Sequence, residues 1–210
     1  MLSYTEKVDD GGLLALWQTT ESVSELLSML YESDKLMPTI TSFGSDKRRK
    51  EFLATRVMLN NVLNTEKQIA YHANGAPYLT DHSYNISIAH TGDIVTILLH
   101  PQQHVGIDVE RIADKVVRVK YKFLSPKELE HLSTLNEKTH LTLLWAAKEA
   151  LYKILGIETV NFVTDLQIAP FEPYLQGTMR GQELLTPQKR CFTLNYRVEP
   201  EYVIVWTVES

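Results

Sequence analysis

The segment LLWAAKEALYKILG, at residues 143–156, constrains the fold more than any other part of the chain. Its leucines, alanines and isoleucine are spaced as in a helix that is mostly buried, and Gly156 is placed to end that helix. Trp145, Glu149 and Lys153 fall four residues apart and therefore share one stripe of it. Either Glu149 and Lys153 form an ordinary surface ion pair, contributing about 0.3–0.5 kcal/mol, or a charged pair is held within an apolar surround for a chemical reason.

Composition limits the classes of protein to which the chain can belong. Its 210 residues are 44% hydrophobic, enough to bury a core in one or two domains. The formal net charge of −5 argues against a general nucleic-acid-binding protein. Cys191 is the only cysteine, so an intrachain disulfide is excluded and a reducing compartment is favoured. Since no apolar run reaches membrane-spanning or signal-peptide length, we expect a cytoplasmic protein with no membrane partner.

Hydrophobic spacing and turn residues predict the order of the elements. Strands are expected at residues 13–17, 84–91, 93–100 and 104–112, and as a series between residues 166 and 208. Helices are expected at residues 22–33, at residues 45–64 and over the segment 143–156. Ser45 or Asp46 would be the N-cap of the second helix. A further helix is expected to begin at Ser125, with Pro126 at its first position and Glu128 completing a capping box. The stretch YHANGAPYLTD, at residues 71–81, is typical of a turn.

Each half of the chain is therefore expected to contain a helix followed by several strands. One series ends in DIVTILLH and the other in EYVIVWTV. We interpret this pattern as two similar α+β lobes that meet near residues 100–105. The predicted division is an N-terminal lobe at residues 1–103 and a C-terminal lobe at residues 104–210, forming one integrated unit.

Two acidic residues on a predicted strand add to the charges of the opening helix. In HVGIDVERI the apolar residues alternate along the strand, so Asp108 and Glu110 point together to the other face. If the helix packs its Glu149 stripe over that face, three carboxylates crowd together and at least one pKa rises sharply. A divalent cation removes this cost, and hard oxygen ligands suit Mg²⁺, often together with substrate phosphates. The plainer alternative is two solvated strand residues, which is the more common outcome for a D-x-E pattern alone.

The strand and the helix together resemble the motif pair of the 4'-phosphopantetheinyl transferase superfamily. Its members commonly carry G-[IV]-D-[IVL]-E and, downstream, W-[ST]-x-K-E-[AS]-x-x-K. This chain has GIDVE and then WAAKEALYK, with Ala146 in place of the usual hydroxyl residue. Upstream, NGAPYL and YNISIAHT resemble the G-K-P and [FY]-N-[IL]-S-H-S blocks. The order and spacing extend over most of the chain and are similar to the long, two-lobed, surfactin-synthetase-activating type.

The resemblance implies a fold and an activity. The fold would be an α+β pseudo-dimer of two similar lobes, each a helix packed on a small, mostly antiparallel sheet, with the active site in the cleft between them. The activity would be transfer of the 4'-phosphopantetheine arm of coenzyme A to a serine of an acyl or peptidyl carrier protein, which converts apo carrier to holo carrier. Mg²⁺ would be the cofactor and coenzyme A the co-substrate. We expect a monomer, because one chain already forms the cleft; fatty-acid, polyketide and peptide-synthetase carriers remain open.

The resemblance also assigns roles to residues of the motif pair. Asp108, Glu110 and Glu149 match the Mg²⁺ ligands of the family. Glu149 also matches the carboxylate proposed to take the serine proton, directly or through water. Lys153 matches the lysine that neutralises or protonates the leaving bisphosphate. The metal would bridge the pyrophosphate oxygens.

Other residues are expected to support the site or to bind coenzyme A. Trp145 and Lys148 are expected to support it. His90 matches a histidine that contacts a coenzyme A phosphate, although a lone strand histidine is more often structural. Four basic residues lie where the family places cations near the 3'-phosphate, in a run that otherwise suggests a solvated face: Arg48, Arg49, Lys50 and Arg56.

Two departures from the family pattern leave an alternative open. Ala76 stands where the G-K-P block has lysine, and Ala89 stands where a serine precedes the histidine. Two lost charge-assisted contacts would weaken coenzyme A binding by roughly 2–5 kcal/mol. The chain is then a non-catalytic or weakly active homologue that binds carrier protein or coenzyme A. A different Mg²⁺-dependent phosphate enzyme would need its own phosphate loop, and no GxxxxGK[ST] sequence is present. A plain interaction domain leaves the carboxylates unexplained.

Overall fold

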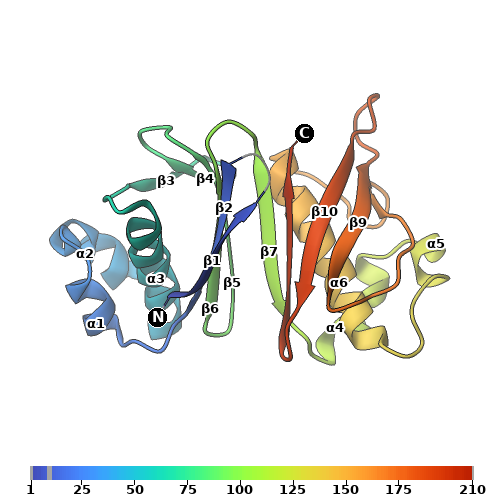
Figure 1. The fold of residues 1–210 in the computed structure, drawn as a ribbon, viewed down its shortest axis with the longest axis horizontal. Helices are drawn as coiled ribbons and strands as arrows, with labels where there is room; N and C mark the ends of the chain where they lie inside the picture. The colour runs from blue at the N-terminus through green and yellow to red at the C-terminus, as the bar shows by residue number, and fades with distance from the viewer. Residues whose placement is uncertain (1, 9–10, 210) are drawn as a thin grey trace.

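The computed structural model of the chain describes residues 2–8 and 11–209. Two antiparallel sheets stand face to face at the centre of the molecule, and helices cover the outer face of each (Figure 1). The expected α+β class is confirmed. Among the described helices, none is both long enough and apolar enough to cross a bilayer.

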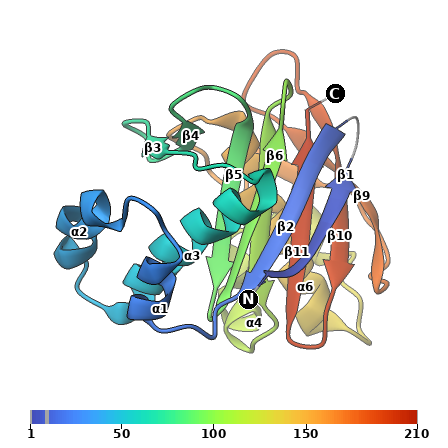
Figure 2. The same cartoon turned by 60° about the vertical axis from the view of Figure 1, so that its left-hand side comes forward.

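The first sheet comes from the first half of the chain. Its strand order is β1 (Leu2–Val8), β2 (Gly12–Gln18), β6 (Ile94–His100) and β5 (Asn85–Thr91). Its outer face is covered by α3 (Asp46–Leu63), and α1 (Val23–Ser28) and α2 (Ser33–Ser42) lie beside α3, farther from the sheet (Figure 2). A separate small hairpin consists of β3 (Ile69–Tyr71) and β4 (Pro77–Leu79).

The second sheet comes from the second half. Its strand order is β7 (Val105–Arg111), β11 (Tyr202–Val208), β10 (Cys191–Val198), β9 (Gln176–Glu183) and β8 (Leu166–Ile168). Its outer face is covered by α6 (Glu137–Leu155), next to α4 (Lys115–Val119), the 3₁₀ turn η2 (Lys120–Lys122) and α5 (Pro126–Leu129).

The two sheets share one chain path. In each, a strand leads into the long helix, and a hairpin follows whose second strand pairs with that first strand. The pairs are β2 with β6 around α3, and β7 with β11 around α6. This repeated path agrees with the pattern of one helix followed by strands that the sequence shows in each half.

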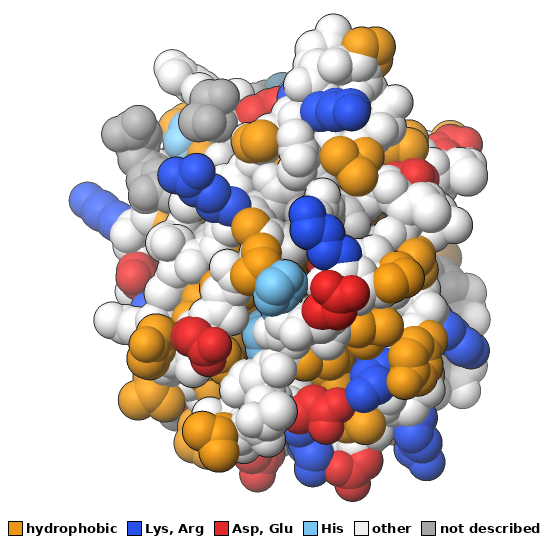
Figure 3. Space-filling model, turned by 90° about the vertical axis from the view of Figure 1, so that its right-hand side faces the viewer, with side chains coloured by type: hydrophobic (Ala, Val, Ile, Leu, Met, Phe, Trp, Pro, Cys, Tyr) orange, Lys and Arg blue, Asp and Glu red, His pale blue; other side chains and the backbone are white. Residues whose placement is uncertain are grey.

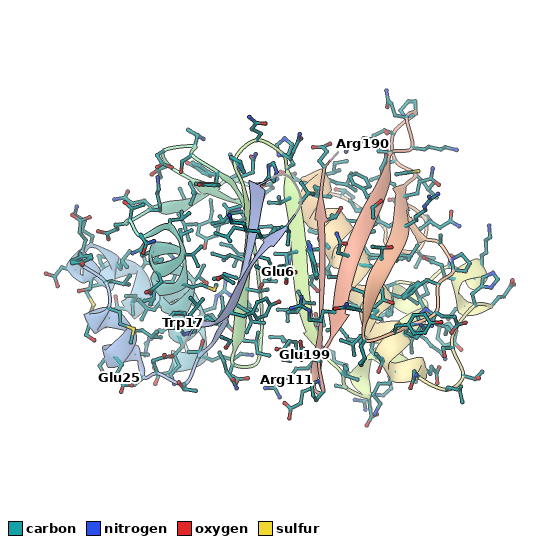
Figure 4. The ribbon with its side chains drawn as sticks, in the orientation of Figure 1. Glu6, Trp17, Glu25, Arg111, Arg190 and Glu199 are labelled. Atoms are coloured by element: carbon teal, nitrogen blue, oxygen red, sulfur yellow. The ribbon has the colours of Figure 1, made fainter. Side chains whose placement is uncertain are left out.

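Three apolar cores hold these layers together. One lies between α3 and the first sheet, one between α6 and the second sheet, and one between the two sheets. Two ion pairs also join the sheets. Arg197 donates to Glu6 over 2.6 Å, and Arg111 donates to Asp93 over 2.6 Å. Figure 4 labels Glu6 on the first sheet and Arg111 on the second.

Most expected elements are confirmed, and the differences have local causes. Ser45 caps α3 by accepting from the backbone N–H of Arg48. The helix expected at residues 22–33 ends at Ser28, where a turn follows, and α2, which begins at Ser33, was not predicted. The turn-like residues 71–81 include part of the β3–β4 hairpin. Strand β1 was not predicted, because the side chain of Glu6, engaged by Arg197, breaks its apolar alternation.

Strand β7 and helix α6 approach each other unusually closely at Gly106. A Cβ atom at this position would lie 2.2 Å from the carbonyl oxygen of Ala150 and 3.1 Å from Cβ of Ile154. Real side chains do not tolerate the first of these distances. The strand can therefore lie against the helix backbone only because residue 106 is glycine, which gives a physical reason for the glycine of the GIDVE motif.

Gly106→Ala should destabilise the protein, because the added methyl group forces α6 away from β7. Overpacking of this kind costs about 1–3 kcal/mol and sometimes more. Urea unfolding followed by circular dichroism measures the change in the free energy of unfolding. Gly44→Ala is the matched control, since its Cβ would meet nothing within 4 Å. Equal stability of the two variants would contradict the close approach.

Candidate active site

The outer face of β7 carries the predicted acidic residues. Val105, Ile107 and Val109 point into the core between the two sheets. Asp108 and Glu110 point the other way, and each contacts a residue of α6. The alternation expected from the sequence is therefore confirmed, and the charged stripe of α6 lies over the acidic face of the strand.

Asp108 and Lys153 form a buried ion pair. The Lys153 ammonium donates to Asp108 Oδ1 over 2.8 Å and to the carbonyl oxygen of Ile107 over 2.8 Å. Asp108 is only 6% exposed, and its other oxygen, Oδ2, is buried without a hydrogen-bond partner among the described residues. Burial raises the pKa of Asp108, although Lys153 opposes the shift. One acceptor of this carboxylate is thus left for a further ligand.

Glu110 is held by the indole of Trp145. The Trp145 Nε1–H donates to Glu110 Oε1 over 2.9 Å. The indole is itself fixed between the rings of Phe123 and Phe162, whose centroids lie 5.0 Å and 5.7 Å away. Burial raises the pKa of Glu110, and the charge of Asp108 raises it further. Trp145 therefore fixes the side chain of Glu110, one of the predicted metal ligands.

Glu149 lies between these two pairs and forms no hydrogen bond or ion pair with the described part of the chain. Burial raises its pKa to about 7, with contributions from the charges of Asp108 and Glu110 against that of Lys153. Three carboxylates thus oppose one another's ionisation at one place. A group with a pKa near 7 is suited to accept a proton at neutral pH.

The donor chemistry of this cluster fits a hard divalent cation. Among the described residues, one oxygen of Asp108 has no partner and Glu149 is unpaired, and both carboxylates would be easier to ionise beside a positive charge. Within residues 2–8 and 11–209, however, no three His, Cys, Asp or Glu side chains form a group that could hold a metal as they stand. Asp108 is turned to Lys153 instead.

Lys148 directly precedes Glu149 in the sequence, but its side chain has different surroundings. Its ammonium is fully buried and donates to Glu128 Oε2 over 2.8 Å, and to three carbonyl oxygens at 2.7–2.8 Å. The carbonyl groups belong to Phe123, Phe162 and Leu166. Two of these residues carry the rings that enclose Trp145. Lys148 thus ties α6 to the segments that carry Phe123 and Phe162, and its role as a supporting residue stays a prediction.

His90 approaches the cluster from the first sheet. Its strand β5 lies beside β7, and the two are joined where the N–H of Ile107 donates to Ser87 Oγ over 3.1 Å. The His90 ring contacts Arg48 and Glu51 of α3. Burial lowers its pKa, and the charges of Arg48 and Lys153 lower it further. The electrostatic coupling with Lys153 links the two sides of the site. Glu51 was not predicted, because a glutamate next to a basic run suggests an ordinary surface pair.

The other predicted cations have structural partners. Arg49 donates to the carbonyl oxygens of Ile40 and Phe43 and to Asp46, which ties α2 to α3. Arg56 is buried against the Phe52 ring and donates to backbone carbonyl oxygens. Hydrogen bonds from Ser22 lower the pKa of Glu25, and the nearby charge of Lys50 adds to this shift. Arg48 is the member of this set that reaches His90.

A cavity of about 790 Å³ opens between the two halves of the chain. It is lined by the β3–β4 hairpin, the first half of β5, the end of α6 and the start of β7. Lys153 and Ala76 both line it, whereas Ala89 is buried in the core between the sheets. The sequence did not predict that Tyr78 would stack on His82 and contact the tilted ring of His72 along one wall. On the α5 side, acidic, basic and apolar side chains are interspersed (Figure 3).

Comparison with known protein families finds a match in the second half of the chain. Residues 104–206, from the start of β7 into β11, match the family model of the 4'-phosphopantetheinyl transferase superfamily. This superfamily uses coenzyme A and acts on carrier proteins. The matched segment contains Asp108, Glu110, Glu149 and Lys153. Comparison with the curated proteins found no match.

Glu149→Gln should change how stability depends on pH in the metal-free protein. The folded state raises the pKa of Glu149 from 4.5 to about 7, so it binds this proton more tightly than the unfolded chain. The group therefore makes the free energy of unfolding fall as the pH rises from about 4.5 to about 7. In the variant, the free energy of unfolding should not show this decrease, which amounts to about 3 kcal/mol at most.

Urea unfolding at pH 5 and pH 8, with a chelator present, measures this difference. The variant should gain stability relative to the wild type at pH 8. Glu158→Gln, which removes an exposed carboxylate beyond α6, should not. Parallel curves of stability against pH for wild type and Glu149→Gln would show that Glu149 ionises normally.

Proposed function

We propose that the chain is a 4'-phosphopantetheinyl transferase of the two-lobed type. The match of residues 104–206 supports the class. The two-lobed organisation, with lobes at residues 1–103 and 104–210 as a pseudo-dimer, is supported by the strand–helix–hairpin path common to both sheets. The cavity between the two halves is the proposed place for coenzyme A.

One observation carries this proposal. Inside the matched segment, Asp108, Glu110 and Glu149 converge on one side of α6 beside Lys153, and Glu149 has no partner among the described residues. This arrangement does not favour folding of the metal-free protein, because each buried carboxylate raises the free-energy cost of ionising the others. It becomes favourable when a divalent cation and a phosphate-bearing substrate complete it.

The chain's own residues supply the remaining chemistry. Asp108, Glu110 and Glu149 would hold Mg²⁺, which, when bound, withdraws charge from the pyrophosphate. Glu149 takes the proton from the carrier serine hydroxyl. The serine oxygen then bonds to the phosphorus that bears the pantetheine arm, and the bond from that phosphorus to the oxygen of the leaving adenosine 3',5'-bisphosphate breaks. Lys153 neutralises or protonates that leaving oxygen.

The alternative of a weakly active homologue concerns coenzyme A binding alone. Ala76 lines the cavity, so a ligand there lacks the ammonium that the family pattern supplies. Ala89 is in the core between the sheets, so no loss of a cavity contact is attributed to it. A weakly active enzyme would show a high KM for coenzyme A with the acid–base residues intact. A cytoplasmic location and a monomeric state stay as predictions.

Incubation with coenzyme A, Mg²⁺ and an apo carrier protein, followed by mass spectrometry of the carrier, tests the function. The wild type should add the phosphopantetheine arm. Asp108→Asn and Glu149→Gln should each lower turnover by about 100-fold or more, because one loses a metal ligand and the other also loses the base. Glu158→Gln is the control and should keep wild-type turnover.

The controls separate chemistry from folding. Circular dichroism should show that all three variants are folded. An unmodified carrier with the wild-type enzyme, across fatty-acid, polyketide and peptide-synthetase carriers, would contradict the proposed activity. Full turnover by Glu149→Gln would remove the proposed base.

A further inference from the structure

We propose that Glu51 is a positioning residue, which holds His90 and Arg48 ready to recognise the phosphate monoester of the nucleotide. The inference rests on the proposed function, because it concerns the nucleotide end of coenzyme A. Glu51 belongs to α3, outside the segment that matches the superfamily.

The three side chains form one connected group. Glu51 is only 8% exposed, and its Oε2 accepts from Arg48 Nη1 over 3.3 Å. Its Oε1 lies 3.4 Å from His90 Nδ1. Arg48 Nη1 also lies 3.0 Å from His90 Nε2. The side chains of His90 and Arg48 are 37% and 57% exposed, so a ligand that arrives from solvent meets them first, with the carboxylate behind.

These contacts determine which ring nitrogen of His90 carries the proton. A guanidinium only donates, so Nε2 of His90 must accept from Arg48 and the ring proton lies on Nδ1, toward Glu51. The hydrogen bond at one ring nitrogen decides what the other can do, and a carboxylate at Nδ1 fixes both the tautomer and the ring orientation. Glu51 thus presents Nε2 and the guanidinium on one exposed side.

The surrounding charge favours an anion. His90 is influenced by Glu51, Arg48 and Lys47 of α3, by Lys153 of α6 and by Asp108 of β7. Glu51 is the carboxylate shared by Lys47 and Arg48, so the group keeps a net positive charge even when His90 is neutral. A phosphate dianion can accept from Arg48 and from a protonated His90 at once. Arg49 and Arg56 are bound to carbonyl oxygens, whereas Arg48 has no such partner among the described residues.

Calorimetric titration with adenosine 3',5'-bisphosphate and with AMP tests the proposal, because the two ligands differ by one phosphate monoester. The wild type should bind the bisphosphate more tightly than AMP. Glu51→Gln should weaken bisphosphate binding about tenfold and AMP binding less than twofold, since only the extra phosphate uses the positioned pair. Asp46→Asn removes a carboxylate from the same helix, beside Arg49, and should change neither.

The protonation of His90 provides a readout that a merely structural role would not move. In protein labelled with ¹⁵N-histidine, the pH at which the His90 ring gains its second proton should be lower in Glu51→Gln than in the wild type, because the carboxylate charge that favours the imidazolium is gone, with His90→Ala used for assignment. Bisphosphate binding by Glu51→Gln that equals or exceeds that of the wild type, in a folded variant, would overturn the proposal. So would a wild type that does not distinguish the two ligands.

These outcomes are separate from those of the carrier assay. A wild type that prefers the bisphosphate but modifies no carrier would contradict the proposed transfer and leave the role of Glu51 standing. A wild type that modifies a carrier while Glu51→Gln keeps full preference for the bisphosphate would contradict the role of Glu51 alone.

Discussion

The contact between the backbone of β7 at Gly106 and the backbone of α6 at Ala150 determines the rest of the site. Since no side chain separates the two elements there, residues on either side of the contact are forced together. Asp108 meets Lys153, and Glu110 meets Trp145, across this seam. The same seam buries Glu149 near both carboxylates. A bulkier residue at position 106 would change all of these distances together.

Three charged residues of one helix differ in their surroundings, and the difference separates scaffold from chemistry. Lys148 is fully buried and has four acceptors, one of them a carboxylate, which is how a buried ammonium is stabilised in a scaffold. Lys153 is paired with Asp108 and lines the cavity. Glu149 has no partner in the described part of the chain, and burial raises its pKa to about 7. Without a ligand, only the surroundings of Glu149 are unfavourable for folding. A role in the chemistry therefore explains Glu149 better than a role in stability.

The parts of the site that depend on local periodicity could be predicted from the sequence. The alternation of HVGIDVERI was enough to place Asp108 and Glu110 on one face, and helical spacing was enough to align Trp145 with Glu149. The sequence could not show that Lys148, adjacent to Glu149, is bound by loops at Phe123, Phe162 and Leu166, because those contacts join distant segments.

The nucleotide side was harder to predict, since basic residues on a helix all look alike in sequence. Arg48, Arg49 and Arg56 are close in sequence, yet only tertiary packing decides that Arg49 ties α2 to α3 and that Arg56 stacks on Phe52. Strand β1 was missed because Glu6 breaks its apolar alternation, and the partner of Glu6, Arg197, lies almost the whole chain away. Long-range partners of charged groups were therefore the main limit on prediction.

The central claim is that Asp108, Glu110 and Glu149 together hold a divalent cation. Titration with Mn²⁺ in the presence of coenzyme A, followed by electron paramagnetic resonance, tests it without depending on turnover. The account predicts one tight site in the wild type, at least about tenfold weaker in Asp108→Asn and unchanged in Glu158→Gln. Equal Mn²⁺ affinity in wild type and Asp108→Asn would contradict it.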